Sequence, residues 1–203
     1  MSSRIITLPN LLTVIRMVLI PVFVIFLYYQ RFALALAVFV TAGITDGLDG
    51  MLARRFNQKS QLGTILDPIA DKLLLVTSFI TLSLPSVISK NAIPPPHSSL
   101  HLPVPFWVTT AVISRDVFII VGAAAINIVT GFRQFRPSWL GKANTVVQIG
   151  AIVVILLAMH LPVLRGYLLP TVYITVFVFA LLSGAHYIFH VSRLLGEDRQ
   201  DRP

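Results

Sequence analysis

The sequence predicts an all-α protein, an integral membrane bundle of six transmembrane helices with both the N- and C-termini in the cytoplasm. Of its 203 residues, 56% are hydrophobic and only 12% are charged, and the mean hydropathy is +0.83. Soluble domains average about 25% charged residues, so there is too little polar surface for a water-soluble body of this size. The length favours one domain, residues 1–203, with a polar tail at 193–203.

Six apolar stretches are long enough to cross about 30 Å of hydrocarbon. They lie near Leu11–Tyr29, Phe32–Leu52, Ile65–Leu84, Phe106–Thr130, Thr145–Leu161 and Leu168–Ile188. The first has the length of a signal peptide, but a second apolar stretch follows at once, so we expect a retained helix. The proline- and serine-rich residues 85–105 predict an extended external connection. Residues 197–202 are polar and are expected to fray.

Basic residues predict the orientation of these helices. The formal charge is +8, and without an aromatic and basic RNA motif this excess indicates anionic lipid headgroups, with no nucleic acid as partner. An N-terminus inside puts ten basic residues inside, namely Arg4, Arg54, Arg55, Lys59, Arg133, Arg136, Lys142, Arg193, Arg199 and Arg202, against three outside, Arg31, Lys90 and Arg165. We therefore expect a multi-pass protein of the inner (cytoplasmic) membrane.

Carboxylates are concentrated where they are costly. Five of the eight lie in or at the ends of apolar stretches, namely Asp46, Asp49, Asp67, Asp71 and Asp116. An ionised aspartate at a helix centre costs about 2.5–3.5 kcal/mol. Asp46 and Asp49 are three residues apart and Asp67 and Asp71 four apart, so each pair shares a helix face. A short polar linker between the two helices makes them antiparallel neighbours, and the four carboxylates are expected to converge near the cytoplasmic surface.

Two kinds of counter-charge could stabilise this cluster. Each aspartate could form a salt bridge with Arg16, Lys72 or Arg115, but three cations cannot neutralise five anions. The alternative is one or two divalent cations, and carboxylate ligands without any cysteine suit Mg²⁺ or Mn²⁺, with Ca²⁺ less specifically favoured. A transporter would distribute its acids along a route across the membrane, so the clustering favours a metal-dependent enzyme over that remote alternative.

The spacing Asp46-x2-Asp49-Gly50-x2-Ala53-Arg54-x8-Gly63-x3-Asp67-x3-Asp71 resembles the signature of the CDP-alcohol phosphatidyltransferase family. That family is also built of six transmembrane helices, so the resemblance covers nearly the whole chain. It implies an enzyme of phospholipid biosynthesis that transfers a phosphatidyl group from CDP-diacylglycerol to an alcohol and releases CMP, in a cytoplasm-facing cavity. It also suggests a homodimer in the lipid bilayer.

The resemblance implies roles for particular residues. Asp46, Asp49, Asp67 and Asp71 would hold two divalent cations, Mg²⁺ or Mn²⁺, and Asp71 would also be the base for the acceptor hydroxyl. The CDP-lipid would contact Gly50, Ala53 and Arg54 of the signature. It would also contact Asn10 and Thr13 near the start of the chain, which resembles the start of family members as well. Polar residues further along are expected to hold the acceptor, namely Arg115, Lys142, Arg133 and Arg136.

Two glycerol-type acceptors stay open. Glycerol 3-phosphate would give phosphatidylglycerophosphate, and phosphatidylglycerol would give cardiolipin. The chain's opening resembles phosphatidylglycerophosphate synthases, which are the commoner members. Ser114-Arg115-Asp116 and the sequence Gly141-Lys142-Ala143-Asn144-Thr145 instead resemble cardiolipin synthases. We expect glycerol 3-phosphate, with cardiolipin synthesis as the alternative.

Overall fold

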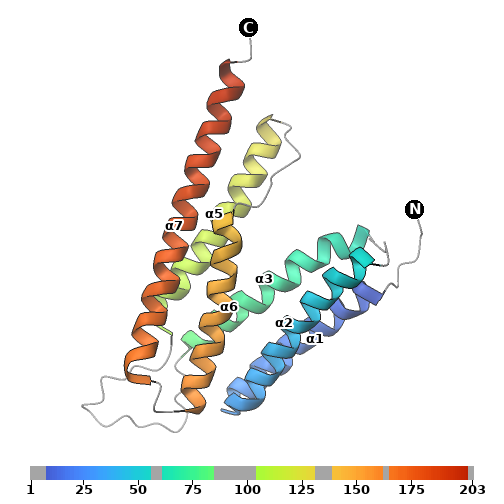
Figure 1. The fold of residues 1–203 in the computed structure, drawn as a ribbon, viewed down its shortest axis with the longest axis vertical. Coiled ribbons are helices and arrows are strands. Elements are labelled where there is room, and N and C mark those ends of the chain that lie inside the picture. The colour runs from blue at the N-terminus through green and yellow to red at the C-terminus, as the bar shows by residue number, and fades with distance from the viewer. Residues whose placement is uncertain (1–7, 56–60, 85–103, 131–138, 162–164, 201–203) are drawn as a thin grey trace. The chain divides into compact units, whose positions relative to one another are not determined.

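A computed structural model describes residues 8–55, 61–84, 104–130, 139–161 and 165–200. Within these ranges it describes no side chains for residues 8–10, 48–55, 61–65, 67–68, 123–130, 165–167 and 190–200. The described part of the chain is all-helical and contains no strand. Its helices are α1 Leu8–Tyr28, α2 Phe32–Arg55, α3 Gln61–Ser83, α5 Phe106–Thr130, α6 Trp139–His160 and α7 Arg165–Gln200 (Figure 1).

The helices coincide with the six apolar stretches, which confirms the predicted all-α class. Three of the helices contain a segment long and apolar enough to cross a membrane, namely Leu11–Tyr28, Trp139–His160 and Leu168–Phe189. Large apolar side chains are also exposed on the helices, with Val18 59% exposed, Phe118 73% and Ile188 68%. Water would penalise this exposure and lipid would not, so the apolar helices indicate a membrane protein.

Most helix ends lie within four residues of the expected ones, and the largest differences occur in two helices. α6 begins at Trp139, six residues before the expected start at Thr145. The expectation that residues 197–202 fray is wrong for residues 197–200, because α7 continues to Gln200. Hydropathy marks where a chain leaves lipid, whereas a helix rich in Glu, Arg and Gln can continue beyond that point because these residues have high helix propensity.

The described residues group into two compact units, Met1–Val104 with Ile152–Leu169, and Pro105–Ala151 with Pro170–Pro203. In the first unit, α1 and α2 are joined by a tight turn at Tyr29–Arg31. The Arg31 N–H donates to the Phe26 carbonyl and the Gln30 N–H to the Leu27 carbonyl, while Gln30 has a left-handed φ of 57°. This is a Schellman ending, which reverses the chain and lays α2 antiparallel to α1.

The core of the first unit follows the inward face of each helix. On α1 this face carries Thr13, Arg16, Phe23 and Leu27, all fully buried. The rings of Phe23 and Phe39 lie 5.8 Å apart and join α1 to α2, and α3 also packs against α1. The inward face of α1 is therefore apolar near the Tyr29–Arg31 turn and polar toward its N-terminus.

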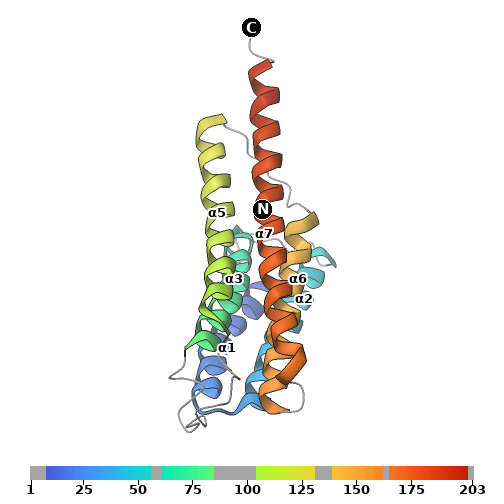
Figure 2. The ribbon, with the colours of Figure 1, turned by 90° about the vertical axis from the view of Figure 1, so that its left-hand side faces the viewer.

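In the second unit, α5 and α7 run parallel and side by side (Figures 1 and 2). The rings of Trp107 and Phe177 meet edge to face at 5.0 Å, and Arg115 bonds Ser183 further along both helices. Buried positions on α7 recur at intervals of three and four residues, namely Tyr173, Val176, Ala180 and Ser183. Such spacing presents one face of α7 to its neighbours.

Candidate active site

Arg16 lies where the core of the first unit becomes polar. Its side chain is 0% exposed, and its Nη1 lies 2.7 Å from Oδ1 of Asp46. The same Nη1 also donates to Oδ1 of Asp71. A single buried guanidinium on α1 therefore joins a carboxylate on α2 to a carboxylate on α3, which the sequence places 25 residues apart.

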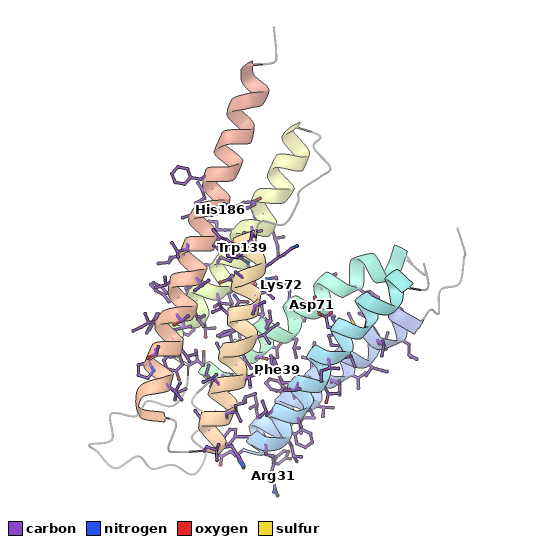
Figure 3. All side chains as sticks on the ribbon, viewed as in Figure 1. Arg31, Phe39, Asp71, Lys72, Trp139 and His186 are labelled. Carbon is purple, nitrogen blue, oxygen red and sulfur yellow. The ribbon has the colours of Figure 1, made fainter. Side chains whose placement is uncertain are left out.

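The two carboxylates differ from their partner in exposure. The Asp46 side chain is 42% exposed and the Asp71 side chain 43% exposed, against 0% for Arg16. The cation thus approaches from inside the unit, while the other side of each carboxylate remains accessible. Figure 3 places Asp71 on α3 well away from Arg31 at the α1–α2 turn.

The shared contact limits the separation of the two carboxylate oxygens. Both lie within hydrogen-bond reach of one nitrogen, so they are at most about 6 Å apart, twice the upper hydrogen-bond length. Two oxygens that bind one Mg²⁺ at about 2.1 Å lie up to about 4 Å apart. A small adjustment of either side chain would bring them to one ion, and hard carboxylate oxygens are the appropriate donors.

For the other two aspartates of the predicted cluster, the structure describes only the backbone of the helix to which each belongs. Asp49 belongs to α2 and Asp67 to α3, like Asp46 and Asp71 respectively, but the side chains of Asp49 and Asp67 lie outside the described set. Among the described side chains no group of three or more His, Cys, Asp or Glu could hold a metal ion. The described half of the predicted ligand set consists of Asp46 and Asp71.

The residues expected to contact the CDP-lipid belong to the first unit. Asn10 and Thr13 lie in the first turns of α1, and the Thr13 side chain is fully buried three residues before Arg16. Gly50, Ala53 and Arg54 lie on the last turns of α2, where the structure describes the backbone alone. Thr13 and Arg16 share one face of α1 because they are three residues apart.

The residues expected to hold the acceptor fall into three groups. Lys142 is exposed on the first turn of α6, and Arg133 and Arg136 lie outside the described residues. Arg115 is 8% exposed on α5, where its Nη1 lies 2.7 Å from Oδ1 of Asp116. Its Nε donates to the Ser183 hydroxyl at 3.2 Å, and its Nη2 donates to the same oxygen.

Arg115 and Asp116 therefore form a buried ion pair supported by a hydroxyl from α7. Asp116 is 5% exposed, so this carboxylate is closed to solvent, unlike Asp46 and Asp71. The sequence allowed Asp116 to be the neighbouring charge of Arg115, and the structure confirms that pairing. Ser183 was not expected, and its only sequence signal is a small polar residue in the last apolar stretch.

Two further polar residues were not among the expected site residues, although Asn144 belongs to a stretch that bears on the acceptor. Asn144 and Gln148 on α6 are both fully buried. Their sequence signal is a pair of amides spaced four residues apart at the edge of an apolar stretch, which places them on one helix face.

Comparisons with known proteins identify the family. The family model for CDP-alcohol phosphatidyltransferase matches residues 6–189. A probable phosphatidylglycerophosphate synthase of Mycobacterium tuberculosis is 31% identical over 205 aligned positions, covering 98% of this chain and 88% of the relative. A CDP-diacylglycerol–glycerol-3-phosphate 3-phosphatidyltransferase of Blochmanniella floridana is 30% identical, covering 93% of this chain and 92% of the relative.

A third relative bears on the acceptor. The cardiolipin synthase (CMP-forming) of Rattus norvegicus is 36% identical over 159 positions, which cover 70% of this chain and 47% of the relative. Members of the family use CDP-alcohol donors and alcohol acceptors and generally depend on a divalent metal. The match over residues 6–189 and the relatives that align along nearly the whole chain show that this protein belongs to the CDP-alcohol phosphatidyltransferase family, as a transferase of phospholipid biosynthesis.

Proposed function

We propose that this protein transfers the phosphatidyl group of CDP-diacylglycerol to glycerol 3-phosphate, giving phosphatidylglycerophosphate and CMP. The observation that carries the proposal is the convergence of Asp46 and Asp71, from two helices, on one buried guanidinium with their outer sides accessible. The two relatives that align over nearly their whole lengths are named for this reaction. The proposal treats residues 1–203 as one catalytic domain.

The proposed step is a displacement at phosphorus. The acceptor hydroxyl oxygen forms a bond to the phosphorus that carries the diacylglycerol, the bond from that phosphorus to the bridging diphosphate oxygen breaks, and CMP leaves with the electron pair. Asp71, accessible on its outer side, receives the hydroxyl proton. Asn10, Thr13, Gly50, Ala53 and Arg54 are proposed to bind the CDP-lipid.

Asp46, Asp49, Asp67 and Asp71 are proposed to hold two divalent cations, Mg²⁺ or Mn²⁺. Asp46 and Asp71 fit this role because their oxygens are hard, near one another and accessible. When bound, such ions neutralise charge on the diphosphate. Arg16 maintains the separation of the two carboxylates from inside the unit.

Arg115, Lys142, Arg133 and Arg136 are proposed to bind the acceptor. The contacts of Arg115 with Ser183 and Asp116 use at least three of its five N–H donors, and they hold the guanidinium in a fixed orientation. Lys142, exposed at the start of α6, is available to an anionic group. The proposed location is the inner (cytoplasmic) membrane, with six transmembrane helices, cytoplasmic termini, a cytoplasm-facing site and a homodimeric assembly.

Cardiolipin synthesis is the second candidate, with phosphatidylglycerol as acceptor. The residues that favour it are Ser114-Arg115-Asp116 and Asn144, where phosphatidylglycerophosphate synthases usually carry different residues. The 36% identity to the rat cardiolipin synthase supports it as well.

The test uses purified full-length protein in detergent with CDP-diacylglycerol and Mn²⁺, and offers glycerol 3-phosphate and phosphatidylglycerol in separate reactions. Product mass identifies the acceptor. Asp71→Asn should abolish CMP release while the protein stays folded, because an asparagine oxygen still accepts the Arg16 hydrogen bond. Asp201→Asn, in the polar tail, is the matched control and should retain turnover. Turnover by Asp71→Asn would show that Asp71 is not the base. If wild-type protein forms no product from either acceptor, the proposed function is overturned.

A further inference from the structure

Two neighbouring amide side chains on α6 are buried without hydrogen-bond partners. Asn144 and Gln148 are both 0% exposed. Among the described residues, none of their four polar atoms, Oδ1 and Nδ2 of Asn144 and Oε1 and Nε2 of Gln148, has a partner. The two residues are four apart, so their side chains project from the same face of α6, about 6 Å apart along its axis.

This arrangement is costly in the resting protein. Each buried polar group left without a partner costs about 1–3 kcal/mol, and neither residue relieves this by reaching solvent. Several polar groups of the same unit are paired: Arg115 bonds Asp116 and Ser183, and the Thr145 hydroxyl, next to Asn144, donates to the Gly141 carbonyl at 3.2 Å. The hydroxyls of Tyr173 and Tyr187 in this unit also lack a partner, but they lie 14 residues apart and each is a single group. Among the described residues of the unit, Asn144 and Gln148 are the two that place four unpartnered polar atoms on one helix face, and this concentration points to a ligand.

We propose that Asn144 and Gln148 form a subsite that binds the glycerol hydroxyls of the acceptor alcohol. The inference rests on the proposed function, because it identifies the ligand as that reaction's acceptor. An amide both donates and accepts hydrogen bonds, and so does a hydroxyl. Both candidate acceptors carry a second hydroxyl beside the one that reacts, and two amides one helical turn apart suit a ligand with two adjacent hydroxyls.

The chemistry of the amides argues against an anionic group at this position. A phosphate dianion only accepts hydrogen bonds, so it would leave the amide oxygens of Asn144 and Gln148 without donors. Lys142 lies two residues before Asn144, about 200° around the helix, and is exposed. A cation and the amide pair therefore occupy different faces of α6, and the amide face recognises neutral polar atoms.

Acceptors that lack the second hydroxyl test this subsite. Glycerol 3-phosphate is compared with 3-hydroxypropyl phosphate, and phosphatidylglycerol with its phosphatidylpropanediol analogue, and kcat/KM is measured for each. Wild-type enzyme should prefer the glycerol-containing acceptor by about tenfold or more. Gln148→Met and Asn144→Leu, which are close in shape and apolar, should reduce that preference toward unity. Thr145→Val is the matched control, because its hydroxyl already bonds within the helix, and it should keep the wild-type preference.

Thermal unfolding separates ligand binding from a structural role. Because Gln148→Met and Asn144→Leu each remove unpartnered buried polar atoms, each should raise the Tm of the acceptor-free protein by about 2–4 °C. A lower Tm would show that the amides have partners in the resting protein and would overturn the inference. If both variants keep the wild-type preference for the glycerol-containing acceptor, the inference is also overturned. The amides would then serve only to bind ordered water or to pack. In either case wild-type turnover would leave the proposed function standing, whereas wild-type enzyme that makes no product would overturn the function itself.

Discussion

Replacing Arg16 with methionine should weaken the resting protein and strengthen its response to a divalent cation. Methionine fills most of the buried volume of the arginine stem without its charge. The substitution removes two charge-assisted contacts, one at 2.7 Å to Asp46 and one to Asp71. It leaves two carboxylates near each other with no buried cation between them.

The magnitude follows from the exposure of the partners. A hydrogen bond between charged groups contributes about 1.5–3 kcal/mol, but both carboxylates are more than 40% exposed, so solvent screening reduces each contact to about 1 kcal/mol. Repulsion between the two carboxylates adds about 1 kcal/mol at a separation near 5 Å in water. The total is about 3 kcal/mol, which lowers the Tm of a chain of this size by about 6–12 °C.

The assay is thermal unfolding in detergent, followed by tryptophan fluorescence, with and without saturating Mn²⁺. Mn²⁺ should raise the Tm of Arg16→Met by more than it raises that of wild type, because the ion no longer competes with a guanidinium for Asp46 and Asp71. Arg16→Lys, which keeps one positive charge but loses the planar fork, should lie between the two proteins. If Arg16→Met unfolds within about 1 °C of wild type in the absence of ion and shows the wild-type Mn²⁺ shift, Arg16 is not the counter-charge of these carboxylates and the reasoning fails.

Substitutions at three further positions test the packing of α5, α6 and α7. Gly122→Ala should lower the Tm by about 2–4 °C, roughly 1 kcal/mol, because its Cβ would lie 2.9 Å from Cε1 of Tyr187 and the ring must move. Gly150→Ala should instead raise the Tm by a similar amount, because no atom lies within 4 Å of its Cβ and alanine has the higher helix propensity. Ser183→Ala should lower the Tm by about 4–8 °C, roughly 2 kcal/mol, because two donors of the buried Arg115 lose their acceptor, and Ser183→Thr should restore most of the loss. Thermal unfolding in the same detergent measures all of them, and equal effects of the two glycine substitutions would contradict the packing of Gly122 against α7.

The sequence predicted where helices lie in the described part of the chain because lipid imposes a simple rule. A spanning segment must satisfy its own backbone hydrogen bonds, so a long apolar stretch predicts a helix. The same rule says nothing about helix ends outside the hydrocarbon, and the two largest differences occur beside polar residues, at Trp139 and at Gln200. A Schellman turn built on Gln30 was also beyond sequence reasoning, since glycine is the usual residue at a left-handed position.

The candidate site was predictable in part for a similar reason. Spacings of three and four residues identified the pairs of aspartates that share a helix face. They could not assign a cation to each carboxylate, because Arg16 lies 30 residues before Asp46 in the chain and its partner is set by how α1 packs against α2 and α3. Burial of Asn144 and Gln148 likewise depends on packing, since a polar residue in an apolar stretch can face a neighbouring helix, a ligand or the interface.

Exposure distinguishes the two buried arginine clusters, around Arg16 and around Arg115, more sharply than charge does. Each contains an arginine with less than a tenth of its side chain exposed and at least one aspartate at 2.7 Å. Asp116 is 5% exposed, so this carboxylate is enclosed, and its negative charge lies 2.7 Å from the Arg115 guanidinium. Asp46 and Asp71 are 42% and 43% exposed, so their outer sides are accessible while Arg16 contacts them from within. A count of five anions against three cations could not separate these cases, because it treats every aspartate as equivalent. Among the described side chains, the accessible cluster is therefore the one that fits the metal-dependent transfer proposed above.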